Sequence, residues 1–227
     1  MERYNATSVS FFSRLLLATI MCIFGALLFN AAFAKSHINE ETIRLALKSG
    51  NLDDILRLLN DVKGMHYQGQ VLPYLDALWH KKINEYPDEP WEVINLDVVR
   101  LEIGNTLMQA DNNNIYKADR GGIHKFVRKT LSTTTDYQLI QYALLTISLF
   151  DSEEDVELIV SIAKKEDRRT FRSAVLALAD MCNEKAKTAL MSLSNQLKRE
   201  DYREYVRIKS KELHELQKKW RLCEPIE

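Results

Sequence analysis

Histidine and cysteine are the side chains that most often hold zinc, and this chain has only five histidines and three cysteines among its 227 residues. The histidines are His37, His66, His80, His124 and His214. Zinc sites place their ligands at short fixed spacings. No two of these histidines lie three to five residues apart, and none lies beside a cysteine. The sequence also lacks a glycine-rich phosphate loop, so we predict no metal and no cofactor.

Two runs of carboxylates could supply a general acid and a general base. They lie at 53–54 and 153–155, and both fall in the first turn of a predicted helix. Free backbone amides and the helix dipole favour negative charge there. Asp111, Asn113 and Asp119 offer oxygen ligands for calcium, but their loop lacks the central glycine and terminal glutamate of an EF-hand. We therefore predict structural roles for these acids and no catalytic residue.

Basic side chains gather in one predicted turn, at Lys164, Lys165, Arg168 and Arg169. A solvated turn is the ordinary interpretation of such a charged run. The alternative is a contact with an acidic region of a protein partner. Tyr116, in a polar loop, is the aromatic residue that we would test first for the same partner, because binding residues often lie on loops.

The first 34 residues have the pattern of a secretory signal. Arg3 and Arg14 precede a mainly apolar run over 15–29, and Ala34 ends a small-x-small cleavage motif, so the mature chain would begin at Lys35. The run is 15 residues long, shorter than the ~20 that a spanning helix needs. We expect a cleaved signal and one domain over 35–227, in the periplasm or secreted. An uncleaved inner-membrane anchor is the alternative.

Charge and cysteine content limit the partners and the compartment. The whole chain has a formal net charge of −1, which becomes −2 when the leader is removed. This balance gives no reason to expect a nucleic-acid partner. Cys182 and Cys223 remain after cleavage, and an even pair in an exported protein is compatible with a disulfide. Two buried thiols are the alternative.

The second half of the chain is predicted to be entirely helical, because residues 123–224 contain neither glycine nor proline. The expected helices are 123–132, 136–150, 153–165, 169–181, 184–198 and 202–221. In the first half, Asn39 and Gly50 are expected to bound one helix, and a second is expected over 51–64. A longer helix is expected within 65–90, ending before Pro87, followed by a central apolar helix from Trp91 to Met108.

Two segments repeat at a spacing of 31 residues. When 142–159 is laid over 173–190, Ala143 falls on Ala174, and the aliphatic residues that follow coincide. Ser152 falls on Asn183, and both are expected to cap the helix that follows. Each copy is therefore a helix, a tight turn and a second helix. Such a pair cannot bury its apolar side alone and must stack on neighbouring pairs.

These copies resemble HEAT-like repeats of the short kind first described in bilin lyases. The resemblance rests on Ala143, Leu144, Leu145 and Ile147 in one copy and on Ala174, Val175, Leu176, Leu178 and Ala179 in the next. It implies an all-α, right-handed α-solenoid of about ten helices in stacked antiparallel pairs. The clearest repeats would span 136–165 and 169–198, and the helix 202–221 would cap the last one. The family implies a scaffold or binding role.

Three functions follow as expectations. The first is an exported, non-enzymatic scaffold or inhibitor that binds a protein, for example an immunity protein against a toxin delivered into the periplasm. The second is an envelope enzyme or cell-wall-modifying factor whose groups meet only in the fold; it requires a histidine facing a carboxylate in a pocket. The third is a membrane-anchored envelope assembly factor, which requires that the leader is retained.

Overall fold

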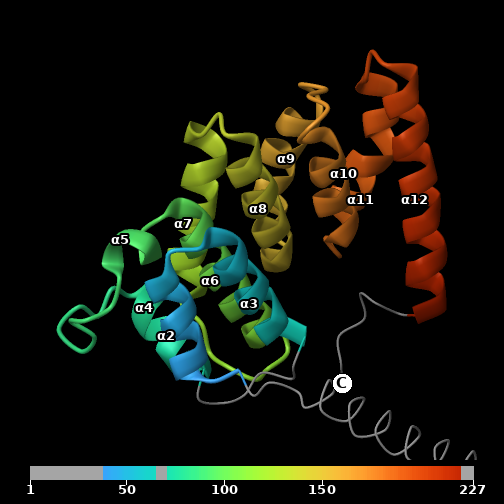
Figure 1. The fold of residues 1–227 in the computed structure, drawn as a ribbon. Helices are drawn as coiled ribbons and strands as arrows, with labels where there is room; N and C mark the ends of the chain where they lie inside the picture. The colour runs from blue at the N-terminus through green and yellow to red at the C-terminus, as the bar shows by residue number, and fades with distance from the viewer. Residues whose placement is uncertain (1–37, 65–70, 221–227) are drawn as a thin grey trace, which may run out of the picture. The chain divides into compact units, whose positions relative to one another are not determined.

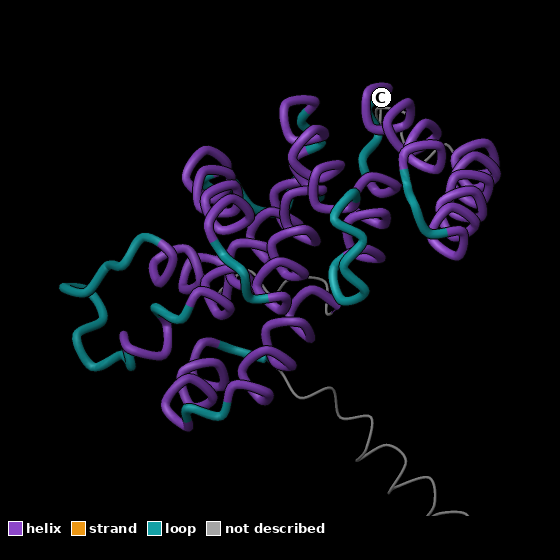
Figure 2. Tube along the Cα trace, turned by 90° about the horizontal axis from the view of Figure 1, so that it is seen from above, coloured by secondary structure: helices purple, strands orange, loops and turns teal. Residues whose placement is uncertain are grey.

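The computed structural model describes residues 38–64 and 71–220. This part of the chain contains eleven α-helices, three short 3-10 helices and no β-strand. Figures 1 and 2 show the helices and the loops that connect them. The α-helices are α2 (Glu40–Ser49), α3 (Leu52–Gly64), α4 (Val71–Trp79), α5 (Trp91–Ile94), α6 (Asp97–Asn112), α7 (Arg120–Thr133), α8 (Tyr137–Ile147), α9 (Val156–Ala163), α10 (Phe171–Asp180), α11 (Glu184–Leu193) and α12 (Glu200–Trp220). The 3-10 helices are η1 (Ser148–Phe150), η2 (Glu153–Asp155) and η3 (Ser194–Gln196). The prediction of an all-α chain is confirmed for these residues.

The first two helices begin and end where the sequence predicts. Asn39 caps α2 by accepting a hydrogen bond from the backbone amide of Thr42 at 2.9 Å. Gly50 ends the helix with a left-handed φ of 67°, a conformation that glycine adopts without steric cost. Ile43 and Leu47 of α2 and Ile55 and Leu59 of α3 are buried in the common core.

The expected long helix within 65–90 is wrong beyond Trp79, where α4 ends. Lys81 adopts a left-handed φ of 52°, and the Lys82 amide donates back to the carbonyl of Ala77 at 3.1 Å, which closes the helix. The apolar stripe fails at the same place, because Ile83 is half exposed and its neighbours are polar. The chain therefore reaches Pro90 through turns rather than as a helix.

Helix α6 is central, as predicted from its apolar residues on more than one side. It packs against α3, α4, α7 and α8, and ten of its residues are buried. Arg100 of α6 lies over the ring of Trp79 at 4.4 Å and over Phe126 at 5.4 Å, so its guanidinium joins α4, α6 and α7. The structure begins this helix at Asp97 and places Trp91 in the separate short helix α5.

Glycine is required at one place in the connection from α6 to α7. Asp119 caps α7 by accepting from the Gly122 amide at 2.9 Å. A Cβ atom at position 122 would lie 2.2 Å from a carboxylate oxygen of Asp119. The predicted polar loop that contains Tyr116 spans only residues 113–119, because α6 continues to Asn112 and Gly121 and Gly122 lie inside α7.

Helices α7 to α12 are arranged in space in roughly the order in which they occur in the chain, as Figure 1 shows. Helix α8 packs against α6, α7 and α10, and α10 packs against α8, α9, α11 and α12. Positions 31 residues apart have similar surroundings. Ala143 and Ala174 are both fully buried, whereas Leu145 and Leu176 are 51% and 38% exposed.

Carboxylates in two turns hydrogen-bond to a later turn of the chain. Asp151 follows η1 with a left-handed φ of 51° and accepts from the backbone amides of Cys182 and the next residue at 2.8 and 3.0 Å. Glu166 follows α9 with a φ of 52° and accepts from the amides of Lys198 and the next residue at 2.6 and 3.0 Å. Each carboxylate therefore bonds to backbone 31 to 33 residues further along.

The two predicted helix caps in the copies have different outcomes. Asn183 caps α11 by accepting from the Ala186 amide at 2.8 Å, as predicted. Ser152 makes no side-chain capping bond. The chain passes from Ser152 through η2 before α9 begins at Val156, so the amides that Ser152 would cap lie in a 3-10 turn.

The last helix, α12, begins at Glu200, two residues before the predicted start. It packs against α10 and α11. Tyr202 stacks on Phe171 with ring centroids 4.0 Å apart, and Val206 is fully buried. No helix in the described part of the chain combines the length and apolarity needed to cross a bilayer. The predicted leader, with Ala34 and Lys35, lies outside the described residues.

Candidate functional site

A stripe of carboxamide side chains runs along one side of the otherwise apolar helix α6. Asn105, Gln109 and Asn112 are spaced by four and three residues, which places them on the same side of a helix. Asn105 donates to the carbonyl of Leu145 at 3.4 Å, and Asn112 donates to the carbonyl of Leu149 at 2.8 Å. The stripe therefore bonds α6 to α8 and to η1, which follows it.

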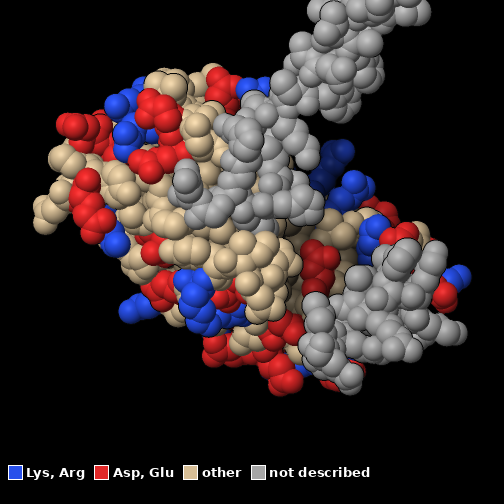
Figure 3. All heavy atoms as spheres, turned by 90° about the horizontal axis from the view of Figure 1, so that it is seen from below, with Lys and Arg blue, Asp and Glu red and all other residues tan. Residues whose placement is uncertain are grey.

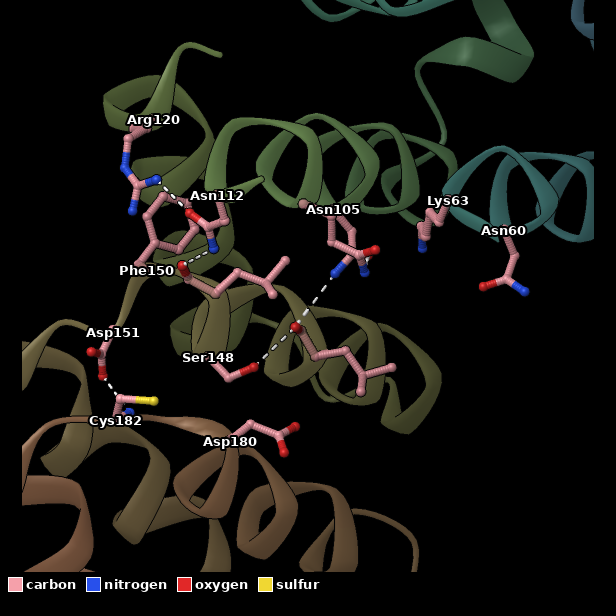
Figure 4. A pocket seen from close by; sticks show the side chains of 13 residues that line it. Asn60, Lys63, Asn105, Asn112, Arg120, Ser148, Phe150, Asp151, Asp180 and Cys182 are labelled. Carbon is pink, nitrogen blue, oxygen red and sulfur yellow. Dashed lines mark hydrogen bonds between the residues drawn. The ribbon is translucent and has the colours of Figure 1, made fainter. Parts of the chain in front are cut away.

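A cavity of about 620 Å³ opens beside this stripe (Figure 4). Helix α3 contributes Asn60 and Lys63, α6 contributes its three carboxamides, and the wall from α8 and η1 includes Leu145 and Phe150. Asp180, at the end of α10, completes the lining together with the turn that follows. Segments distant in sequence thus form one polar cavity with apolar walls.

Both basic residues of the cavity are already paired. Lys63 forms an ion pair with Glu102, which is 6% exposed. Arg120 bonds to Asp111 at 2.6 Å and to Asn112 at 2.7 Å. Burial opposes ionisation of Asp111, but the bonds from Arg120 and from a backbone amide hold its pKa below the usual range.

A smaller cavity of about 270 Å³ shares Asn60, Lys63, Asn105 and Leu145 with the larger one. Tyr142 lies in its wall, and burial, together with the negative charge of nearby carboxylates, raises the pKa of the phenol. Because the two cavities share these four residues, they form one groove along α3, α6 and α8. We call it the α6 groove, and Asp180 lies in its wider part.

A separate cluster joins α7 to η2. Asp155 is fully buried and accepts from Nε2 of His124 at 2.6 Å and from Nη1 of Arg128 at 2.7 Å. The His124 ring packs against Phe150 with centroids 4.7 Å apart, and its Nδ1 lies 3.7 Å from Glu154. The acids at 153–155 were expected only to interact with the helix dipole. The structure shows that Asp155 also bonds to side chains of α7.

This cluster meets only half of the requirement for an enzyme. His124 faces a carboxylate, but neither His124 nor Asp155 lines the α6 groove. Among the described residues, no serine, threonine or cysteine is bonded to His124 as a nucleophile would be. Ligand atoms of His124, Glu154 and Asp155 lie within 4.8 Å of one another. Arg128, however, already supplies positive charge to both carboxylates, so a metal ion would have to displace it.

Tyr116 is less exposed than we expect of a residue that contacts a partner. It is half-buried against the core, and burial together with the charge of Asp76 raises the pKa of its hydroxyl. It lines a neighbouring cavity of about 510 Å³ with Asn114, Ile115 and Lys117, and this cavity shares Asn112 and Arg120 with the α6 groove. Its role as a partner contact stays a prediction.

The predicted basic contacts lie on the exposed turn between α9 and α10. Lys164 lines a cavity between α9 and α11, whereas Arg169 lies over the Tyr137 ring at 4.8 Å and pairs with Asp167 at 3.2 Å. Lys165 and Arg168 are exposed on the same turn. None of the four lines the α6 groove.

Cys182 lines the α6 groove and is disulfide-bonded. Its predicted partner, Cys223, lies outside the described residues, so the pairing stays a prediction. A bond between the two cysteines would link Cys223 to the turn after α10. A disulfide of this kind stabilises a protein mainly by restricting the unfolded chain.

Sequence reasoning missed the α6 groove, although α6 carried a signal for it. Asn105 is 5% exposed in a helix that is otherwise largely apolar. A buried carboxamide needs hydrogen-bond partners, so Asn105, followed by Gln109 and Asn112 on the same side of the helix, indicates a polar contact. Asp180 had no such signal, because its position in the cavity depends on how α10 packs against α8.

The surface agrees with the balanced composition. On the side shown in Figure 3, acidic and basic side chains are interspersed over the described residues. No protein-family model, no curated protein and no solved structure matches the chain significantly. We therefore infer its function from its own residues.

Proposed function

We propose that the chain is an exported, non-enzymatic scaffold that binds an extended segment of a protein partner along the α6 groove. The observation that carries the proposal is the exposure of Leu145. It is 51% exposed between the two parts of the groove and is surrounded by carboxamides. An exposed apolar side chain can anchor a partner, and carboxamides can both donate to and accept from a peptide backbone.

The architecture that we propose is a right-handed α-solenoid of stacked helix pairs with HEAT-like repeats. Contacts of α8 with both α6 and α10 support it. So do the bonds from Asp151 and Glu166 to backbone about one period later. Leu176 of α10 is equivalent to Leu145 of α8 and is also exposed, so a partner that follows the stack would meet apolar side chains on the corresponding helices of successive pairs.

An inhibitor of a toxin delivered into the periplasm is a specific form of this proposal. It requires export and a binding surface, but no chemistry of its own. The membrane-anchored alternative differs only in whether the leader is retained. The enzyme alternative is weaker, because neither His124 nor Asp155 lines the α6 groove and Arg128 already pairs with Asp155.

Affinity capture from the native envelope fraction tests the proposal when two matched variants are compared. Leu145→Glu places a charge in the groove. Met191→Glu makes the same change on α11, where Met191 is 71% exposed and lines neither part of the groove. We expect a partner to be retained by wild type and Met191→Glu and to be lost by Leu145→Glu. If both variants retain the same partner, the α6 groove is not its binding surface.

A further inference from the structure

Each basic residue that lines the α6 groove is paired with a carboxylate, whereas one acidic residue is left without a bonded partner among the described residues. Lys63 pairs with Glu102, and Arg120 pairs with an aspartate of α6. The carboxylate of Asp151 is engaged by the turn after α10. Asp180 also lines the cavity, but it makes no hydrogen bond or ion pair within the described part of the chain. The unneutralised charge of the cavity is therefore negative.

We propose that Asp180 is the counterion for a basic side chain, lysine or arginine, of the protein segment that binds in the α6 groove. The inference rests on the proposed function and adds the chemistry of the bound segment. In a protein segment, the residues on either side of the lysine or arginine can bind the groove at the same time. Asp180 is exposed to solvent where it lines the cavity, so the cation of a partner can reach its carboxylate.

The cavity also suits the rest of a basic side chain. Lysine and arginine bury their aliphatic stems against apolar surface while the charged end reaches a polar partner. Leu145, Leu149 and Phe150 supply such a surface in the same cavity as Asp180. The volume of about 620 Å³ lies within the ~300–1,000 Å³ of ligand pockets, so the side chain and adjoining backbone can enter together.

Protonation of Asp180 is coupled to this binding. Desolvation by the surrounding protein raises the pKa of its carboxyl, and no neighbouring charge contributes to the shift. The other charged groups of the cavity are Lys63, Arg120 and Asp151, each of which is already bonded. A bound cation favours the ionised carboxylate and lowers its pKa again. Where the free carboxyl is protonated, binding releases a proton, so affinity should fall when the pH is lowered through the raised pKa.

Selection from a random peptide library displayed on phage, with the full mature protein as bait, tests the proposal. We expect selected peptides to share a lysine or arginine at one position. Replacing an arginine there by citrulline, which keeps the shape but removes the charge, should weaken binding about threefold to fivefold, because an exposed ion pair contributes up to about 1 kcal/mol. Asp180→Asn should weaken the arginine peptide equally and should not weaken the citrulline peptide further.

The outcomes separate the two proposals. If wild type selects peptides that Leu145→Glu fails to bind, but they share no basic residue or bind Asp180→Asn equally well, the role of Asp180 is wrong and the proposed groove stands. If wild type selects no peptide, or if Leu145→Glu binds the selected peptides normally, the proposed function fails and the inference fails with it. Circular dichroism of Asp180→Asn checks that any loss of binding does not come from misfolding.

Discussion

The bonds from Asp151 to the turn after α10 give a sharp test of how the helices are stacked. One carboxylate oxygen accepts from the backbone amides of Cys182 and Asn183 and from the Asn183 side chain, at 2.8, 3.0 and 2.9 Å. Bonds to a charged group contribute about 1.5–3 kcal/mol each when buried. This turn is exposed, so water can replace part of each bond. We expect Asp151→Ala to lower the free energy of unfolding by about 2 kcal/mol.

A second change separates these hydrogen bonds from backbone strain. Asp151 has a φ of 51°, which costs most residues roughly 1–2 kcal/mol but costs glycine little. Asp151→Gly should therefore be less damaging than Asp151→Ala by about 1 kcal/mol. Glu153→Ala is the matched control, because it removes an exposed acid from the next turn and should change stability by less than about 0.5 kcal/mol.

Urea unfolding followed by circular dichroism measures these differences. For a chain of this length, a loss of 2 kcal/mol should lower Tm by about 4–8 °C. Equal stability of Asp151→Ala and Glu153→Ala would refute the reasoning, since the bonds to the turn after α10 would then contribute nothing measurable.

Three further predictions concern other parts of the chain. Asp155→Asn should lower the free energy of unfolding by about 2–4 kcal/mol, because it leaves Arg128 and His124 without their buried carboxylate; unchanged urea unfolding would contradict this. Gly122→Ala should lower the free energy of unfolding by about 1–2 kcal/mol, because the new Cβ atom displaces the Asp119 cap of α7. An unchanged Tm in thermal unfolding would contradict this. The mass of the native protein should correspond to a chain that begins at Lys35, whereas retention of the leader would add its full mass.

The helices could be predicted from the sequence because their signals are local. Asn39 and Gly50 bound α2 as expected, and Asn183 begins α11. The absence of glycine and proline over 123–224 predicted the run of helices from α7 to α12. The failure in 65–90 has a local cause as well: Ile83 continued the apolar spacing in sequence but is exposed, and the left-handed Lys81 ended the helix first.

The candidate site could not be predicted in the same way, because it depends on contacts between distant segments. Asp180 reads in the sequence as an ordinary polar residue at a helix end, and only the packing of α10 brings it into the same cavity as Lys63. The pairing of His124 with Asp155 likewise joins residues 31 apart. The acids at 153–155 had a satisfactory local explanation in the first turn of a helix, so nothing in the sequence indicated the ion pairs of Asp155.

Site-specific photo-crosslinking in the native envelope tests most directly whether the α6 groove is the binding surface. A photoreactive p-benzoylphenylalanine replaces Leu145 in one variant and Met191 in the other, because both side chains are exposed and on different helices. The account predicts a covalent adduct with one protein partner from position 145 and none from position 191. An adduct from position 191 alone would contradict it, as would equal adducts from both.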